Sequence, residues 1–147
     1  MNNYHNGLNI LLVDDSEDDI IMAQKAFAQL SFPHKLETVM SAQAALDYLQ
    51  CRGSYADRKP VLPDILLLDI NMPLMNGFAL LKILKADQLL KKIPVIMLTS
   101  SSAMEDVSRS YECGAASFIT KPESFEGFKN LLGDFGKYWL TVSALPQ

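Results

Sequence analysis

Three aspartates in this sequence directly follow apolar runs. Asp14 and Asp15 come after LNILLV, and Asp69 comes after DILLL and begins a segment containing Asn, Pro and Gly. An aspartate in such a place caps a helix, forms a turn or acts as a reagent. A turn needs at most one such residue, so the pair Asp14 and Asp15 calls for a further explanation.

The acids that follow them need only a structural explanation. Glu17, Asp18 and Asp19 lie just after Ser16, a candidate helix cap. A helix dipole favours acids in its first turn by roughly 0.3–1 kcal/mol each. We therefore assign these three residues to the start of a helix.

If Asp14, Asp15 and Asp69 converge, they must be protonated or neutralised. Two like charges about 4 Å apart repel by roughly 4 kcal/mol at an effective dielectric constant near 20. No Cys or His stands beside these residues, so an all-oxygen site would take a hard cation. Mg²⁺, with Mn²⁺ as a substitute, fits such a site. Because Mg²⁺ held by one or two carboxylates usually also contacts phosphate, the chemistry indicated is phosphoryl transfer.

Two further polar residues end apolar runs, Thr99 after PVIML and Lys121 after ASFIT. Separately, the threonine could be a strand former or a helix cap, and the lysine a solvated charge. Together with the aspartates they supply a hydroxyl donor and a fixed cation, the groups that stabilise phosphoryl oxygens. The combination favours a chemical role, with Asp69 as the reagent.

Five strand-like runs alternate with segments of helical periodicity. The runs span 8–13, 35–39, 64–68, 94–98 and 116–120. Helices are expected after Ser16, over 41–50, over 77–90, after Ser102 and over 124–140. This alternation predicts an α/β fold with a doubly wound parallel sheet. In the flavodoxin-like (βα)5 order 2-1-3-4-5, ligands bind between strands one and three, where the three aspartates would meet.

Composition restricts the class of protein further. The chain has 147 residues, 49% hydrophobic and 20% charged, as in one folded domain. Its net charge of −4 argues against nonspecific binding to nucleic acid or to an anionic membrane. No apolar stretch approaches the ~20 residues that span a bilayer. Cys51 and Cys113 are interpreted as reduced thiols of a cytoplasmic protein. Residues 51–63 are interpreted as a surface loop, with a partner-binding insert as the alternative.

The segments LLVDD, DILLLDINMPLMNG, PVIMLTS and GAASFITKP occur in an order and spacing that resembles the receiver domain of two-component response regulators. The resemblance covers residues 8–140. It implies that Asp69 accepts a phosphoryl group from a phosphohistidine on a sensor histidine kinase or phosphotransfer protein. It also implies that Asp15, Asp69 and the backbone carbonyl of Asn71 bind Mg²⁺ directly, while Asp14 acts mainly through water.

The resemblance assigns roles to the remaining site residues. Thr99 and Lys121 would hold phosphoryl oxygens, and a cis peptide between Lys121 and Pro122 would aim the lysine. Thr99 and Phe118 would form the switch that responds to phosphorylation. The protein would catalyse only its own phosphorylation and dephosphorylation, so it would not be an enzyme acting on an outside substrate. Asn71 and Ser101 would tune a slow to moderate hydrolysis.

The last part of the chain suggests how the signal leaves the domain. Residues 141–147 form a short tail without an output domain, which implies a stand-alone regulator. The tail and the long 51–63 loop resemble the small response regulators paired with bacterial phytochromes. The last helix carries an apolar seam that includes Phe125, Phe128 and Trp139. Packing on the helix's own sheet explains the first half of this seam, whereas the distal Trp139 and Val142 would lie beyond the width of the domain. On the distal half we base the expectation of a homodimer through this helix and the surface of helix four, strand five and helix five.

Two other functions compete with this interpretation. A phosphatase of the haloacid-dehalogenase type also uses an aspartate at a strand end, but it needs a second acid two residues later, where this chain has Asn71. Its nucleophile also follows an early strand, whereas Asp69 follows the third. The second alternative is a binding module that has kept the fold and lost phosphorylation. The presence of all five polar residues at the strand ends argues against it.

Overall fold

The computed structural model describes residues 7–100 and 104–138. Five parallel strands form one sheet in the order β2-β1-β3-β4-β5, which confirms the predicted α/β, flavodoxin-like topology. The strands are β1 (Leu8–Val13), β2 (His34–Val39), β3 (Ile65–Leu68), β4 (Val95–Thr99) and β5 (Ser117–Thr120).

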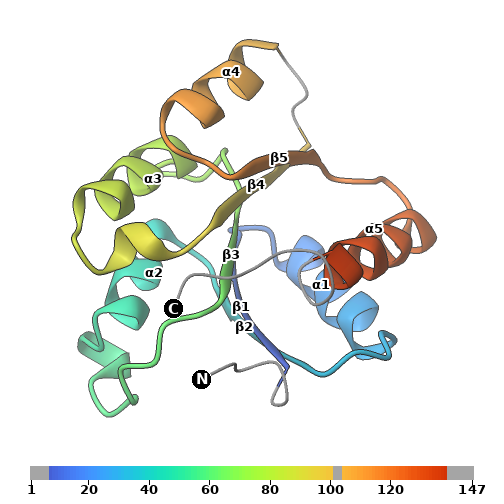
Figure 1. The fold of residues 1–147 in the computed structure, drawn as a ribbon, viewed down its shortest axis with the longest axis horizontal. Helices are drawn as coiled ribbons and strands as arrows, with labels where there is room; N and C mark the ends of the chain where they lie inside the picture. The colour runs from blue at the N-terminus through green and yellow to red at the C-terminus, as the bar shows by residue number, and fades with distance from the viewer. Residues whose placement is uncertain (1–6, 101–103, 139–147) are drawn as a thin grey trace.

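Helices follow each strand and cover the sheet (Figure 1). They are α1 (Glu17–Ala28), α2 (Ala42–Leu49), α3 (Gly77–Ala86), α4 (Met104–Glu112) and α5 (Phe125–Lys137), with short 3-10 turns η2 (Gly53–Tyr55) and η3 (Leu90–Lys92). Ser16, Ser41 and Ser124 cap α1, α2 and α5 by accepting a backbone N–H three residues on. The predicted cap Ser102 lies outside the described residues.

The third helix is shorter than the sequence predicts, since α3 ends at Ala86 rather than at residue 90. The Asp87 carboxylate accepts hydrogen bonds from the backbone N–H groups of Leu89 and Leu90, at 2.8 and 2.9 Å. Such side-chain to backbone bonds compete with a helix and favour a turn. The chain therefore leaves α3 and forms η3 before β4.

The core consists of two apolar layers, one on each face of the sheet. In β1, Leu11 and Val13 face the layer formed with α2 and α3, whereas Ile10 and Leu12 face the layer formed with α1 and α5. This alternation follows from the two-residue period of a strand. Strands buried on both faces are apolar throughout, which explains the continuous runs of the sequence.

The long loop between α2 and β3 is fastened to α2. The Arg58 guanidinium donates hydrogen bonds to the backbone carbonyls of Tyr48 and Val61. Its carbon atom Cζ lies 3.8 Å from the centre of the Tyr48 ring. The loop therefore has a defined conformation, although most of its residues are exposed. Across the described residues, every helix is too short or too polar to span a membrane.

Candidate functional site

The site begins with two neighbouring strands that end at the same edge of the sheet. Val13 of β1 pairs with Leu68 of β3, so the residues that follow them, Asp14 and Asp69, lie side by side. The backbone N–H of Asp69 donates to the carbonyl of Val13 at 2.9 Å, which continues the strand pairing up to the site. The predicted convergence of strand ends is therefore present.

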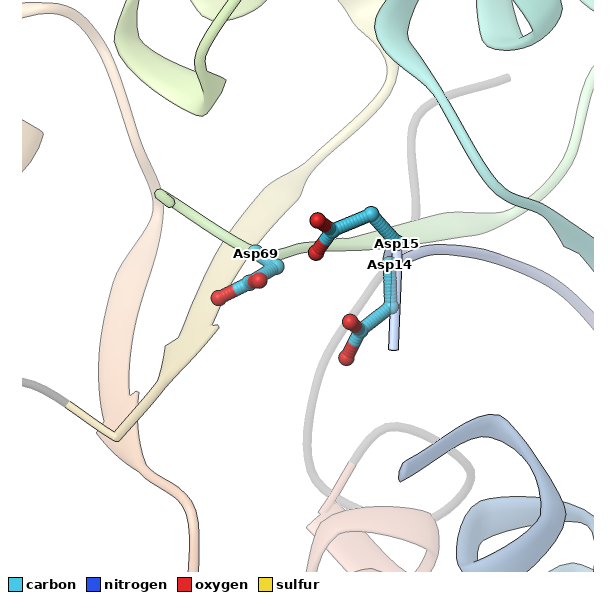
Figure 2. A group of neighbouring side chains, drawn as sticks. All are labelled: Asp14, Asp15 and Asp69. Carbon is cyan, nitrogen blue, oxygen red and sulfur yellow. The ribbon is translucent and has the colours of Figure 1, made fainter. Parts of the chain in front are cut away.

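Figure 2 shows the carboxylates of Asp14, Asp15 and Asp69 gathered at this edge. Each contributes an oxygen atom to a group whose members all lie within 4.8 Å of one another. Asp14 and Asp69 are buried, with 1% and 7% of their surface exposed, while Asp15 is exposed. Buried carboxylates of like charge are unfavourable unless a cation or proton compensates them.

Lys121 supplies part of that compensation from the end of β5. Its Nζ lies 2.6 Å from Asp14 Oδ2, 2.8 Å from Asp19 Oδ2 and 3.8 Å from Asp69 Oδ1. Its backbone N–H donates to the carbonyl of Thr99 at 2.8 Å, which fixes the lysine beside the end of β4. The other oxygen of Asp14 accepts the backbone N–H of Ser16 at 2.9 Å. Asp14 thus accepts a hydrogen bond on each oxygen, one from Lys121 and one from the start of α1.

Asp69 is less well compensated than Asp14. Burial raises the pKa of its carboxyl from 3.8 to about 6, and the charges of Asp14 and Asp15 act in the same direction. The charge of Lys121 and a hydrogen bond from the Thr99 hydroxyl lower this pKa only in part. Lys121 therefore compensates an ionised Asp69 only in part, and a bound cation would supply further positive charge.

For Lys121, the neighbouring carboxylates together have a larger effect on the pKa than burial has. Burial tends to lower the pKa of Lys121, but its hydrogen bonds to Asp14 and Asp19 outweigh this effect and raise the pKa. The ammonium therefore remains charged at neutral pH. One cation among Asp14, Asp15, Asp19 and Asp69 leaves the site with excess negative charge. An oxygen-lined site of this charge fits a hard divalent cation.

The turn after β3 approaches Asp69 closely through Gly77. The Gly77 backbone N–H donates to the carbonyl of Ile70 at 2.8 Å. A Cβ atom added at Gly77 would collide with the carbonyl oxygen of Asp69 and lie 2.9 Å from the Cα of Ile70. A glycine is therefore required where α3 begins. Asn71 lies exposed within this turn, and metal binding by its backbone carbonyl remains a prediction.

The predicted cis peptide bond between Lys121 and Pro122 is wrong. The described residues contain no cis peptide bond, so this bond is trans. The trans form of a bond preceding proline is favoured by about 0.5–1 kcal/mol when nothing opposes it. From the trans chain, the Lys121 ammonium already reaches Asp14 and Asp19. The lysine is thus aimed into the site without a cis bond.

The two switch candidates occupy different environments. Thr99 is fully buried at the end of β4. Phe118 lies on β5 opposite Met97 and is half-buried against the layer shared with α2 and α3. Their part in switching remains a prediction. Ser101 lies outside the described residues.

Sequence reasoning missed the role of Asp19. It was assigned to the helix dipole alone, yet its carboxylate binds Lys121. One signal was available in the sequence. Because α1 follows β1 almost directly, its first turn must lie at the same edge of the sheet as Asp14, within reach of that site.

The fold and the acidic site define an α/β domain with an oxygen-lined group at one edge of its sheet, and comparison with known proteins identifies the family. The chain matches the response regulator receiver domain over residues 10–132 and therefore belongs to that family. This confirms the resemblance found in the sequence.

Individual relatives are similar over nearly the whole chain. The response regulator Rcp1 of Synechocystis sp. is 32% identical, over 93% of this chain and 92% of Rcp1. The probable methanogenesis regulatory protein FilR2 of Methanothrix harundinacea is 34% identical, over 93% of this chain and 86% of FilR2.

Solved structures agree with these sequence matches. The phosphorylated cyanobacterial phytochrome response regulator RcpA has a TM-score of 0.86 and 34% identity, over 95% of this chain and 99% of RcpA. The Mn²⁺-bound form of Rcp1 has a TM-score of 0.83 and 31% identity, over 95% of this chain and 99% of Rcp1. The chain is therefore similar to phytochrome response regulators.

Proposed function

We propose that this protein is a response regulator that accepts a phosphoryl group on Asp69 from a histidine kinase or phosphotransfer protein. One observation carries the proposal. Asp69 ends a central strand with a buried carboxylate, within reach of Lys121 and beside two further carboxylates. Its neighbours provide both a fixed cation and ligands for a second one. The receiver unit comprises residues 8–140, followed by the tail 141–147.

The transfer is an in-line displacement. An oxygen of ionised Asp69 attacks phosphorus, an acyl phosphate bond forms, and the bond from phosphorus to the donor imidazole nitrogen breaks. The electron pair of that bond leaves with the imidazole. The protein contributes placement and charge, as in phosphoryl transfer generally. Lys121 offsets negative charge on the phosphoryl oxygens, and the Thr99 hydroxyl donates to one of them. Water later hydrolyses the acyl phosphate.

A divalent cation, Mg²⁺ or Mn²⁺, completes the site. Asp15, Asp69 and the backbone carbonyl of Asn71 would hold it, with Asp14 acting through water. When bound, the cation neutralises negative charge shared between the carboxylates and the phosphoryl oxygens. The raised pKa of Asp69 is consistent with this assignment, because burial and the charges of Asp14 and Asp15 disfavour its ionised form and a bound cation would favour it. The Mn²⁺-bound structure of the relative Rcp1 also supports it.

Phosphorylation would act as a switch rather than as a step of an enzymatic cycle. Thr99 would move toward the phosphoryl group, and Phe118 would repack against the neighbouring core. The surface of α4, β5 and α5 would pass this change to partners, including a second copy of the chain. The phytochrome response regulators among its relatives suggest a phytochrome-type kinase as the donor. Two free cysteines are consistent with a cytoplasmic location.

The test is to incubate the protein with acetyl phosphate and Mg²⁺, and to compare the wild type with Asp69→Asn. Intact mass should increase by one phosphoryl group in the wild type only, and hydroxylamine should remove the group, as expected for an acyl phosphate. Excess EDTA should prevent the reaction. If Asp69→Asn is also phosphorylated, the acceptor is another residue. A wild type that is never modified would favour the phosphorylation-independent binding module.

A further inference from the structure

A solvent-open cavity lies at the opposite end of the sheet from Asp69. Its volume is about 430 Å³, within the range of about 300–1,000 Å³ typical of sites for small ligands. Its walls come from the first residues of β1 and β2, the end of α2, and the long loop between α2 and β3. The lining includes Asn9, Lys35, Tyr48, Tyr55 and Lys59. The 51–63 loop thus forms one wall of a cavity.

Two tyrosines and an arginine pack together to form an aromatic wall of this cavity. The rings of Tyr48 and Tyr55 pack edge to face, with centroids 5.2 Å apart. The Arg58 guanidinium lies on the Tyr48 ring. Three of its N–H groups donate to backbone carbonyls at 2.8–3.0 Å. Such a wall is organised before any ligand binds, which reduces the entropy cost of binding.

The cavity is positively charged in a chain that is negative overall. Lys35, Arg58 and Lys59 line it, against one acid, Glu37. Among the described residues, none of these four forms an ion pair within 4.0 Å. The carbonyls that fix Arg58 are neutral, so its charge is not cancelled. The formal charge of the lining is therefore +2, whereas the chain carries −4.

The other contributions to the lining are apolar or neutral. Ile10, Val61, Leu62 and Pro63 provide an apolar surface. Burial raises the pKa of the Tyr48 hydroxyl, which therefore stays neutral and able to donate a hydrogen bond at ordinary pH. An apolar surface, an aromatic wall and cations without an ion-pair partner suit a ligand with an aromatic, apolar body and a negative charge at one end.

We propose that this cavity binds a small organic anion with a flat apolar body, of the aromatic carboxylate class. The carboxylate would lie between Lys35 and Lys59, and the ring would pack against Tyr55 and the apolar residues of the loop. The cavity and Asp69 lie at opposite ends of the strands, so binding does not require phosphorylation. The proposal is therefore independent of the function proposed for Asp69.

A matched pair of probes tests the charge requirement. 2-Naphthoate and (2-naphthylmethyl)ammonium have the same ring and opposite charge, and each is titrated into the full chain while amide resonances are followed by NMR. 2-Naphthoate should shift the resonances of Asn9, Lys35, Tyr55 and Lys59, and should bind at least about threefold more tightly than the ammonium probe. Another cavity lies between β5 and α5, where Ile119, Leu131 and Phe135 line it. Equal affinity, no binding at all, or shifts confined to that cavity would overturn the proposal.

Matched variants test the residues. Replacing both lysines, Lys35→Gln with Lys59→Gln, should weaken 2-naphthoate binding about three- to tenfold, since each exposed charge contributes modestly. Both side chains are exposed, so the fold should be retained. Arg52→Gln is the control. Arg52 belongs to the same loop and pairs with Asp47 at 3.6 Å, but it does not line the cavity. Equal weakening in this control would also contradict the assignment.

Discussion

The ammonium of Lys121 lies 2.8 Å from the carboxylate of Asp19, although the two residues are 102 positions apart in the sequence. The same ammonium is 3.8 Å from Asp69, the proposed acceptor. Without a phosphoryl group, the lysine lies closer to Asp19 of α1 and to Asp14 than to Asp69. We expect Lys121 to weaken its contact with Asp19 when it contacts a phosphoryl group on Asp69. Breaking the ion pair between Lys121 and Asp19 costs free energy, and a substitution of Asp19 removes that cost.

We predict that Asp19→Asn will accelerate labelling of Asp69 by acetyl phosphate about two- to fivefold. The Asp19 side chain is 37% exposed, so the lost ion pair corresponds to less than about 1 kcal/mol. Asp18→Asn is the matched control, since it removes the same charge from the same helical turn without touching Lys121. Labelling rates are measured by intact mass at a fixed Mg²⁺ concentration. A slower Asp19→Asn reaction would mean that this contact positions the lysine productively.

Stability should depend on pH through Asp69 in the absence of metal. Its folded-state pKa of about 6 exceeds the ordinary value of 3.8. Between these values the folded chain binds more protons than the unfolded chain, so stability falls as pH rises. Asp69→Asn cannot ionise, so in EDTA it should be more stable than the wild type by about 1–3 kcal/mol above pH ~7.

The same difference should vanish below pH ~4, where both folded and unfolded states of the wild type are protonated. Urea denaturation followed by circular dichroism measures it. Saturating Mg²⁺ should reduce or reverse the gain, because a ligand that binds only the folded wild type stabilises it. If Asp69→Asn is less stable than the wild type in EDTA across this pH range, the carboxylate is better compensated than its burial indicates.

Asp15→Asn should weaken Mg²⁺ binding at least about tenfold while leaving the fold intact. Asp15 is an exposed member of the carboxylate group, and the loss of one charged ligand from a site with few protein ligands is costly. Titration calorimetry with Mg²⁺ measures the affinity, and unfolding in EDTA reports on the fold. Glu17→Gln, an acid outside the group, should bind Mg²⁺ as the wild type does. Equal weakening in both variants would indicate only a general charge effect.

A pair of glycine substitutions tests how tightly the turn after β3 supports the site. Gly77→Ala should destabilise the protein by about 1–3 kcal/mol, as overpacking does, and should slow labelling, because the new Cβ displaces the backbone of Asp69 and Ile70. Gly133→Ala is the matched control in α5, where the Cβ would only meet Leu30 Cδ2 at 3.9 Å. There alanine should stabilise the helix by up to about 1 kcal/mol. Urea denaturation and labelling rates distinguish the two variants.

The elements and the edge of the sheet that carries the site were predictable because they follow from local and periodic signals. Continuous apolar runs indicated β1, β3 and β4 as buried strands, and Ser16 and Ser41 marked where helices begin. Parallel strands end at one edge, so the residues after them had to gather there. The length of α3 was not predictable in this way. The helical pattern of the sequence continues to residue 90, but hydrogen bonds to the Asp87 side chain end the helix at Ala86.

The sequence by itself determined which residues come to the site: Asp14, Asp15 and Asp69 with Thr99 and Lys121. It could do so because strand direction and a two-residue period are properties of the chain alone. Only the tertiary structure decided that the lysine binds Asp14 and Asp19 more closely than Asp69, because that depends on where the first turn of α1 lies relative to the end of β5. For the same reason, the trans bond at Pro122 and the cationic cavity beneath the 51–63 loop emerged only from the folded chain.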